Sequence, residues 1–212
     1  VDIQIAINAI NHLLNNYGST INTNRKSYLY SSKNVDMDNL INDMNNNKVD
    51  AIMFANTNPV YTLSNVDAFS SGLKKVGLKI SFSDTIDETS VWCDYVCPDR
   101  NYLESWGDLK PYDGFYSLQQ PTISPLFNSR QIQDSLLIWM GKEKTYYKYL
   151  KDYCKNNISN NWNKVLHDGY FETPIDETRY SFNTSIGNSI INISNKTSNT
   201  LEIELYIKSS LG

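Results

Sequence analysis

Three short apolar segments, each followed by a polar loop, limit the folds open to this chain more than any other feature. They occupy residues 49–55, 78–84 and 94–98. Apolar residues at helical spacing fill 66–76, and residues 84–88 carry the start signals of a further short helix. A strand–helix–strand–helix–strand order with short connections is typical of a parallel sheet with right-handed crossovers. We therefore predict an α/β fold with a Rossmann-like, doubly wound parallel sheet and flanking helices.

The first of these segments, residues 49–55, is almost continuously apolar. Such a run indicates a strand that is buried on both faces, as in the middle of a parallel sheet. Residues 114–130 are instead rich in aromatic residues and interrupted by prolines. We expect this stretch to lie extended over a surface.

The spacing of apolar residues predicts helices elsewhere in the chain as well. One runs over 3–17 and is closed by Gly18, and another, over 34–44, can be capped by Asn34 or Asp36. Three more are expected in the second half of the chain, at 131–140, 145–155 and 160–169. We expect these helices to bury their apolar faces against a sheet or against one another.

After Pro174 the apolar period changes from that of a helix to that of a strand. Residues 201–207 alternate apolar and polar side chains, and turn signals separate them from two earlier alternating runs. This pattern predicts a C-terminal antiparallel β meander. We expect residues 1–170 to form one α/β domain and residues 171–212 to form a β-rich extension that packs on it. Because the chain lacks an initial Met and both ends look cut, we expect a fragment of a longer protein.

The charge balance of this 212-residue chain argues against several kinds of partner. Its formal net charge is −4, which disfavours nucleic acid or an anionic membrane surface as a main partner. No apolar run approaches the ~18 residues that a membrane-spanning helix needs. We therefore expect no nucleic-acid partner and no direct membrane span in this chain.

Metal-binding side chains are scarce in the sequence. There are three cysteines and two histidines, and the spacing of Cys93 and Cys97 matches neither a zinc knuckle nor a thioredoxin-type motif. The histidines, His12 and His167, are far apart in the sequence. We expect no metal site, and we interpret all three cysteines, Cys154 included, as small buried hydrophobic residues.

The loops that follow the three strands form the candidate site, because ligands of parallel sheets bind at the carboxyl ends of the strands. In the first loop, Asn56 and Asn58 could contact a phosphate or a pterin, but an Asn-Pro pair is also simply a good turn starter. No P-loop, Rossmann glycine fingerprint or nucleophile-elbow motif accompanies these loops.

The second loop, "SDTIDET", allows two interpretations. Asp84 or Glu88 could meet a ribose or the edge of a guanine. Alternatively, Asp84 or Thr85 caps a short helix, with Asp87 and Glu88 placed favourably near its positive end. We favour the capping interpretation.

The third loop, residues 97–108, contains Glu104, which could act as an acid or a base. No histidine or second carboxylate stands at a spacing that makes a catalytic pair evident, so we favour a structural carboxylate that binds loop amides. Pro98 and Gly107 would fix the shape of this loop, with Trp106 as a buried anchor. The sequence therefore predicts no catalytic residue.

Longer stretches of the sequence resemble a known family. "AIMFANTNPVYTLSN", "LKISFSDTIDETSVWCDYVCPDRNYLESWGD" and "SLQQPTISPLFNSRQIQDSLLIWMG" are similar to the third domain of molybdopterin oxidoreductases. In that domain an NP loop, a DET helix start and a D-x-V-x-P segment followed by E-x-x-G recur in this order. The motifs are short, but their order and spacing are fairly specific.

Within that superfamily the chain resembles the large iron–sulfur subunit of alternative complex III of the Bacteroidetes type, a bacterial quinol oxidoreductase. The stretches "AINAINHLLNNYGSTI", "YLESWGD", "QPTISPLFNSRQ" and "LEIELYIKSSLG" carry this similarity. It covers nearly the whole chain. In the family, the molybdopterin-like half is thought to carry no molybdenum cofactor, and a ferredoxin-like half holds the iron–sulfur clusters.

The resemblance implies a role in a respiratory complex that oxidises quinol and passes electrons to a cytochrome or an oxidase. Its partners would be the iron–sulfur half of the same parent chain and the membrane and cytochrome subunits. Its place would be the periplasmic side of the bacterial inner membrane. The sequence agrees with a cofactor-free half, because it lacks both glycine-rich segments for the cofactor's phosphates and the cysteine runs that bind clusters.

We therefore expect a non-catalytic scaffold domain in which the protein's own side chains fill the ligand-facing rim of the sheet. The first alternative is the cofactor-binding part of an active molybdopterin-dependent oxidoreductase. The second is an unrelated nucleotide-binding module. If a vestigial or alternative pterin pocket exists, its residues would be Asn56, Asn58, Asp84, Thr85, Glu88 and Glu104.

Overall fold

A computed structural model describes residues 2–29, 34–158 and 161–175, together with the isolated positions 181, 186, 187 and 191. The chain divides into two compact units, the larger of which spans residues 26–175. The other unit takes in residues 1–25 and 176–212. The later strands of the predicted C-terminal meander lie outside the described residues, and the predicted packing of 171–212 on 1–170 stays a prediction.

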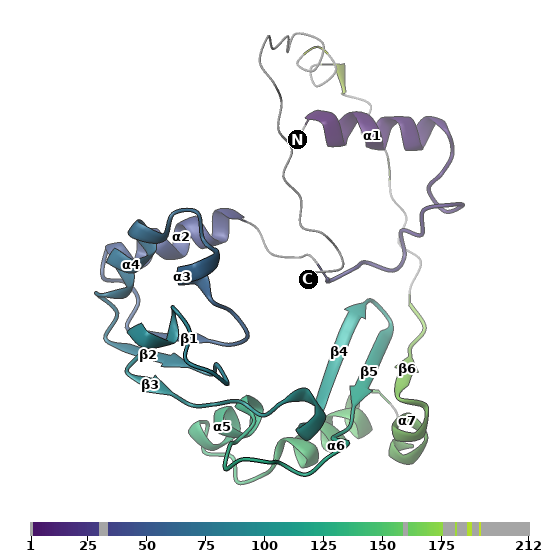
Figure 1. Ribbon diagram of the computed structural model, residues 1–212. Helices are drawn as coiled ribbons and strands as arrows, with labels where there is room; N and C mark the ends of the chain where they lie inside the picture. Colours follow the sequence, from purple (N-terminus) through teal and green to yellow (C-terminus); the bar gives the residue numbers. More distant parts are fainter. Residues whose placement is uncertain are drawn as a thin grey trace. The chain divides into compact units, whose positions relative to one another are not determined.

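A three-stranded parallel sheet forms the first part of the larger unit (Figure 1). Its order is β1–β2–β3, with β1 at Ala51–Phe54, β2 at Leu78–Ser81 and β3 at Tyr95–Val96. The helices α3 (Pro59–Thr62) and α4 (Val66–Leu73) connect β1 to β2. A single 3₁₀ turn, η1 (Ser90–Trp92), connects β2 to β3. The predicted parallel sheet is confirmed, while the finer doubly wound, Rossmann-like arrangement stays a prediction.

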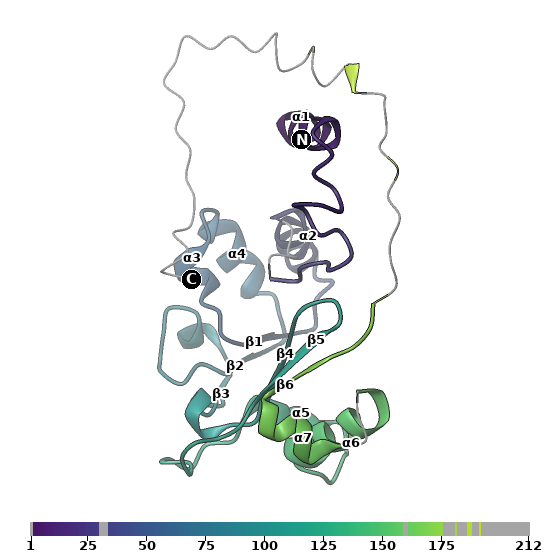
Figure 2. The same cartoon turned by 90° about the vertical axis from the view of Figure 1, so that its right-hand side faces the viewer.

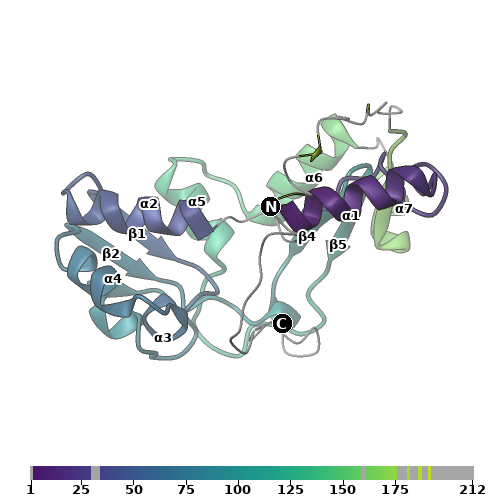
Figure 3. The same ribbon diagram turned by 90° about the horizontal axis from the view of Figure 1, so that it is seen from above.

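One face of this sheet packs on α4 and on α2 (Asn34–Asn45), which lie on the same side of it (Figure 2). The view from above shows α2 and α4 in the same part of the larger unit as β1 and β2 (Figure 3). Burial of apolar surface is the main stabilising term here. The fully enclosed members of this core are Ile41, Met44, Phe54, Phe69, Leu73 and Val76.

The prediction that the first strand is buried on both faces is wrong. Successive side chains of a strand point to opposite faces, and in β1 Phe54 is 5% exposed whereas Met53 is 49% exposed. The reason is that α2 and α4 cover only the face that carries Phe54.

The first helix, α1 (Asp2–Leu13), belongs to the other unit and ends earlier than predicted. The N–H groups of Asn15 and Asn16 donate to the carbonyls of His12 and Asn11, and Asn15 has φ 53°. This is the Schellman arrangement, in which a left-handed residue satisfies the last carbonyls of a helix. Asn15 therefore takes the role that the sequence assigned to Gly18.

An antiparallel sheet forms the second part of the larger unit. It consists of β4 (Gly107–Tyr112), β5 (Phe115–Gln119) and β6 (Tyr170–Glu172), in that order. Tyr112 pairs with Phe115, so Asp113 and Gly114 form a two-residue hairpin turn. Gly114 has φ +77°, and a Cβ there would lie 2.8 Å from the carbonyl oxygen of Thr173.

The sequence analysis missed β4, because it interpreted Gly107 only as a residue that fixes the shape of the third loop. The stretch 114–130, expected to be extended, contains β5 at its start and no further regular element among the described residues. The signal for the hairpin was present: Asp-Gly is a strong two-residue hairpin turn.

Three helices in the second half confirm the predictions, namely α5 (Ile132–Trp139), α6 (Tyr146–Asn157) and α7 (Trp162–Asp168). The side chain of Thr145 accepts a hydrogen bond from the Lys148 N–H at 3.5 Å and caps α6. A second core lies between α6 and α7, with Leu150, Cys154, Trp162 and Val165 enclosed.

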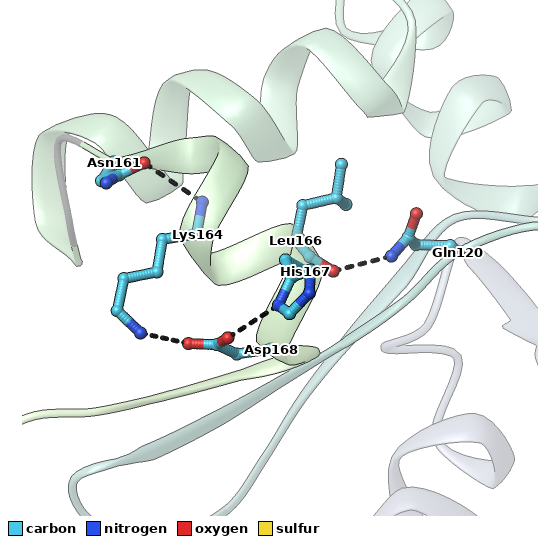
Figure 4. Close-up of polar contacts among 6 residues, drawn as sticks. All are labelled: Gln120, Asn161, Lys164, Leu166, His167 and Asp168. Carbon is cyan, nitrogen blue, oxygen red and sulfur yellow. Dashed lines mark hydrogen bonds and ion pairs between the residues drawn. The ribbon is translucent and has the colours of Figure 1, made fainter.

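The ends of α7 show how local residues define this helix (Figure 4). Asn161 accepts from the Lys164 N–H at 3.1 Å at its start, and Gly169, with φ 76°, ends it as a left-handed cap. The side chain of Gln120 donates to the carbonyl of Leu166 at 2.9 Å, which ties the segment after β5 to this helix.

The interpretation of the cysteines is partly corrected. Cys154 is fully buried in the second core, whereas Cys93 and Cys97 are only partly buried. Both lie beside the short edge strand β3, where few elements are present to cover them. Burial nevertheless raises the pKa of the Cys93 thiol to about 11, so it is a poor nucleophile at neutral pH.

Candidate functional site

A cleft of about 820 Å³ opens at the carboxyl ends of the three parallel strands. The loops after β1, β2 and β3 line it, together with residues of β4 and β5. This is the end of a parallel sheet at which ligands bind, as the sequence predicted. The expectation that the protein's own side chains fill this rim is wrong. The hairpin of β4 and β5, which the sequence analysis did not predict, lines the space at the strand ends but leaves it open.

The first loop is fixed by side-chain hydrogen bonds. Asn56, two residues after the end of β1, has φ 50°. The Asn58 side chain donates to Glu88 at 2.7 Å and accepts from the Thr89 hydroxyl at 2.7 Å. Thr89 is fully buried and also accepts from the Val60 N–H at 3.0 Å. Asn58 therefore joins the first loop to the second.

The same contact affects the charge of Glu88. The hydrogen bond from Asn58 favours the carboxylate and holds the pKa of Glu88 below its usual range. Asn58 and Glu88 are thus brought together as a pair, but only Asn58 lines the cleft.

In the second loop the side chain of Asp87 binds the backbone at the start of η1. Its carboxylate accepts from the N–H groups of Thr89 and Ser90 at 3.1 and 2.6 Å. Burial tends to raise the pKa of Asp87, but the hydrogen bonds from Ser90, Ser83 and Thr89 outweigh it and the pKa is lowered. Asp84 and Thr85 do not cap η1, whose N-cap residue, Thr89, makes no side-chain capping hydrogen bond; the structural use of this loop falls to Asp87 instead.

The two residues first considered as caps lie exposed beside each other. The Thr85 hydroxyl donates to the Asp84 carboxylate at a long 3.4 Å. Asp84 lines the cleft, as do Asn56 and Asn58.

The third loop contains η2 (Tyr102–Glu104), which Asn101 caps by accepting from the Leu103 N–H at 3.0 Å. Glu104 is 7% exposed, and its carboxylate accepts from the Leu126 N–H at 3.3 Å. This contact is of the structural kind that we favoured. Glu104 lines a separate hollow of about 510 Å³, so it is not brought together with the other candidate residues.

Trp106 is only half-buried. Its ring lies 4.6 Å from the ring of Tyr147, and it lines both the cleft and the smaller hollow. It is an anchor, as predicted, but one side of it faces open space.

Of the charged residues in the cleft, the sequence analysis considered Asp84 and Asp87 but proposed no role for Asp99, Arg100 or Asp108. Four carboxylates and one guanidinium line it, belonging to Asp84, Asp87, Asp99, Asp108 and Arg100. Asp99 accepts from the N–H groups of Arg100 and Ile132, each at 2.8 Å, and so holds the start of α5 at the third loop. Asp99 and Arg100 directly follow the third predicted strand. The sequence could therefore have placed them at the carboxyl ends of the strands, where ligands bind.

Asp108 could not be found in this way, because it lies on the missed strand β4. It accepts a hydrogen bond from the hydroxyl of Tyr146 on α6. Burial and this carboxylate together raise the pKa of Tyr146 well above its usual range. Tyr146 therefore keeps its proton and donates to Asp108 in the ordinary pH range.

Within the residues that the structure describes, no three histidine, cysteine, aspartate or glutamate side chains are grouped so that they could hold a metal ion. No helix in the same part of the chain is both long and apolar enough to cross a membrane.

Comparison with protein-family models yields no match. The chain is 38% identical over 96 residues to the "Menaquinone reductase, molybdopterin-binding-like subunit" of Nitratidesulfovibrio vulgaris (strain Hildenborough). That match covers 43% of this chain and 14% of the relative, so the matched part is about one seventh of the relative's length.

Among solved structures, acetylene hydratase from Pelobacter acetylenicus is similar, with a TM-score of 0.52 and 19% sequence identity. This match covers 64% of the chain and 20% of that protein, and at this identity it bears on the fold alone. The match to the menaquinone reductase subunit agrees with the coarser part of the family resemblance over 96 residues, and the match to acetylene hydratase supports the fold alone.

Proposed function

We propose that this chain is a non-catalytic scaffold domain of a respiratory electron-transfer subunit of the molybdopterin oxidoreductase-like class. The parent would be the large iron–sulfur subunit of a quinol-oxidising complex of the alternative complex III type. Similarity to a subunit whose name combines menaquinone reductase with "molybdopterin-binding-like" supports the quinone-linked context.

The observation that carries this proposal is the charge along the cleft. Four aspartates line it against a single arginine, whereas phosphate groups are bound by cations, helix N-termini and backbone N–H groups. The guanidinium of Arg100 is also partly used, since its Nε donates to the carbonyl of Ser129 at 3.2 Å. The residues present therefore do not fit a phosphate-bearing pterin cofactor, and the scaffold function needs no chemistry at this cleft.

In this function the strand-end loops serve packing. The bonds of Asn58 and Asp87 hold the first and second loops in one shape, and Asp99 joins the third loop to α5. The partners would be the iron–sulfur half of the parent chain and the membrane and cytochrome subunits. The complex would lie on the periplasmic side of the bacterial inner membrane, with all clusters in the iron–sulfur half.

A second function is favoured by one observation, the open space itself. Ligand sites commonly measure ~300–1,000 Å³, and the cleft falls within that range. The exposed carboxylate of Asp84 could accept hydrogen bonds from a guanine edge, beside the neutral side chains of Asn56 and Ser83. The domain would then hold the nucleotide end of a pterin cofactor in an active molybdopterin-dependent oxidoreductase.

Metal and pterin analysis of the full-length protein, purified from its native host, separates these functions. The scaffold function predicts iron and acid-labile sulfide without molybdenum, tungsten or extractable pterin. Stoichiometric molybdenum or tungsten together with pterin would overturn it.

Titration with guanosine monophosphate tests the nucleotide site by itself, including the possibility of an unrelated nucleotide-binding module. We expect no saturable binding. If binding occurs, it should be lost in Asp84→Asn and kept in Asp67→Asn, an exposed change on α4 that lies outside the cleft.

A further inference from the structure

The hollow that Glu104 lines is a second cavity of the larger unit, with a volume of about 510 Å³. This volume is within the ~300–1,000 Å³ of ligand sites. The charged residues of its wall are Glu104, Asp134 and Arg100. Because two carboxylates stand against one guanidinium, the wall carries a net negative charge. The hollow therefore attracts a cation more than an anion.

Glu104 presents one of its two carboxylate oxygens to this space. The side chain is 7% exposed, which is rare for a glutamate, and its Oε1 accepts from the Leu126 N–H at 3.3 Å. Among the described residues, no donor bonds its Oε2, yet no fully buried side-chain oxygen there lacks a partner. Oε2 therefore reaches open space, and the space that Glu104 lines is the hollow. It is a ready acceptor for an N–H group of a ligand.

Asp134 has the same arrangement at the start of α5, where it is half-buried. Its Oδ1 accepts from the Tyr146 N–H at 2.6 Å, and within the described part of the chain no donor bonds its Oδ2. Both carboxylates are thus held by a backbone N–H through one oxygen and keep the other for a ligand. Side chains fixed in this way lose little conformational entropy on binding.

Two aromatic rings complete the wall. Trp106 and Tyr147 both line the hollow, are half-buried, and have ring centroids 4.6 Å apart. A cation within ~6 Å of such a ring is attracted by the negative charge of its face. Pro121 and Pro125 add further apolar surface. The wall therefore suits a ligand with a positive end and an apolar stem.

Arg100 restricts the choice of cation. Its Nε donates to the carbonyl of Ser129 at 3.2 Å, and among the described residues it forms no ion pair with Glu104 or Asp134. It does not neutralise these carboxylates by direct contact. Its own charge repels a second positive group, so a ligand with one positive end fits better than one with two.

We propose that the hollow binds one primary alkylammonium group, which donates to Glu104 and Asp134 while its alkyl stem lies against Trp106 and Tyr147. A primary ammonium has three N–H donors for the two open oxygens, whereas a quaternary ammonium has none. A lysine side chain of another polypeptide and a free amine both carry this group. This binding site goes beyond the scaffold function and does not rest on it.

Titration of the full-length protein with n-butylammonium, followed by ligand-detected NMR, tests the proposal. We expect saturable binding. The neutral probe 1-butanol and the anionic probe butyrate have the same chain length and should bind roughly tenfold more weakly, because neither can donate charged N–H bonds to the carboxylates. Absence of saturable butylammonium binding would overturn the proposal, as would binding of either control probe at least as tightly.

Two conservative variants locate the site, because the cleft also carries carboxylates. Glu104→Gln and Asp134→Asn each keep an oxygen for the backbone N–H and lose the charge, so the fold should be kept. Each should weaken butylammonium binding roughly tenfold. Asp67→Asn, an exposed change on α4 outside the hollow, should leave the binding unchanged. The proposal fails if neither variant weakens binding more than this control does.

Two further probes distinguish the sources of the group. Nα-acetyl-lysine N-methylamide has one positive end and represents a lysine of another polypeptide, whereas putrescine has two and represents a free polyamine. We expect the lysine derivative to bind more tightly, because Arg100 repels the second ammonium. Tighter binding of putrescine would identify a free polyamine as the source. Metal and pterin content, which test the scaffold function, are measured separately from these titrations.

Discussion

The two halves of the larger unit bury their side chains in different ways. Beneath the parallel sheet the core is mainly aliphatic, and Phe69, Met44 and Leu73 are at most 1% exposed. Beside the antiparallel sheet, the ring of Trp106 lies next to those of Tyr147 on α6 and Trp162 on α7, and Trp106 stays half exposed. The core of the first half is thus closed beneath the sheet, whereas the aromatic cluster of the second half is only partly covered. Five predictions test this difference.

The largest effect is expected for Phe69→Ala in the closed core. The ring meets that of Phe54 edge-on, with centroids 6.3 Å apart, and its removal leaves a cavity between α4 and the sheet. We expect the free energy of unfolding to fall by about 3–5 kcal/mol, measured by denaturant titration with circular dichroism. The control Tyr61→Ala removes an exposed ring and should change it by less than ~0.5 kcal/mol.

Leu150→Ala makes the same kind of cavity in the second half, where Leu150 is 2% exposed. We expect a loss of about 2–4 kcal/mol. Hydrogen exchange then sharpens the comparison: Phe69→Ala should speed exchange mainly in β1 and β2, and Leu150→Ala mainly in α6 and α7. If each change speeds exchange equally everywhere, the two halves unfold as one and the distinction between them is wrong.

Thr89→Val tests the polar link between the strand-end loops. Valine keeps the shape of the side chain but removes the hydroxyl that bonds Asn58 and the Val60 N–H. Because the buried N–H then has no acceptor, we expect a loss of about 1–3 kcal/mol. Thr85→Val, an exposed change four residues earlier, should be nearly neutral by the same thermal or chemical denaturation.

Asn161→Ala removes the cap of α7 in the second half. A lost cap costs about 1 kcal/mol, whereas an aspartate in its place caps equally well. Asn161→Ala should therefore lower the melting temperature and Asn161→Asp should not. Equal melting of the two variants would show that tertiary packing alone defines the start of this helix.

The smallest effect is the pH dependence contributed by Asp87. Its pKa in the folded state is lowered, so its contribution is complete above the unfolded-state pKa of ~3.9 and is lost as pH falls through the folded-state value. Asp87→Asn keeps an acceptor but cannot titrate. The stability difference between the wild type and this variant should shrink as the pH is lowered below ~4, which denaturation at a series of pH values measures. A difference that grows in acid would contradict the sign of the shift.

Most of the regular elements could be predicted from local patterns. The helices α4 to α7 and the strands β1 and β2 each carry their own apolar period and end signals, such as Asn161 and Gly169 around α7. The strand β4 carries no such period, because residues 107–112 are largely polar or half exposed. It is stabilised by its pairing with β5, which local spacing does not encode.

By itself, the sequence determined the parallel order of the first three strands and the side of the sheet on which a site would lie. Both follow from the alternation of strand and helix and from short connections. Only the tertiary structure decided that β1 is covered on one face, that the cleft is open and acidic, and that Glu104 faces away from it. These properties depend on distances between segments far apart in the chain, such as the position of the hairpin across the strand ends.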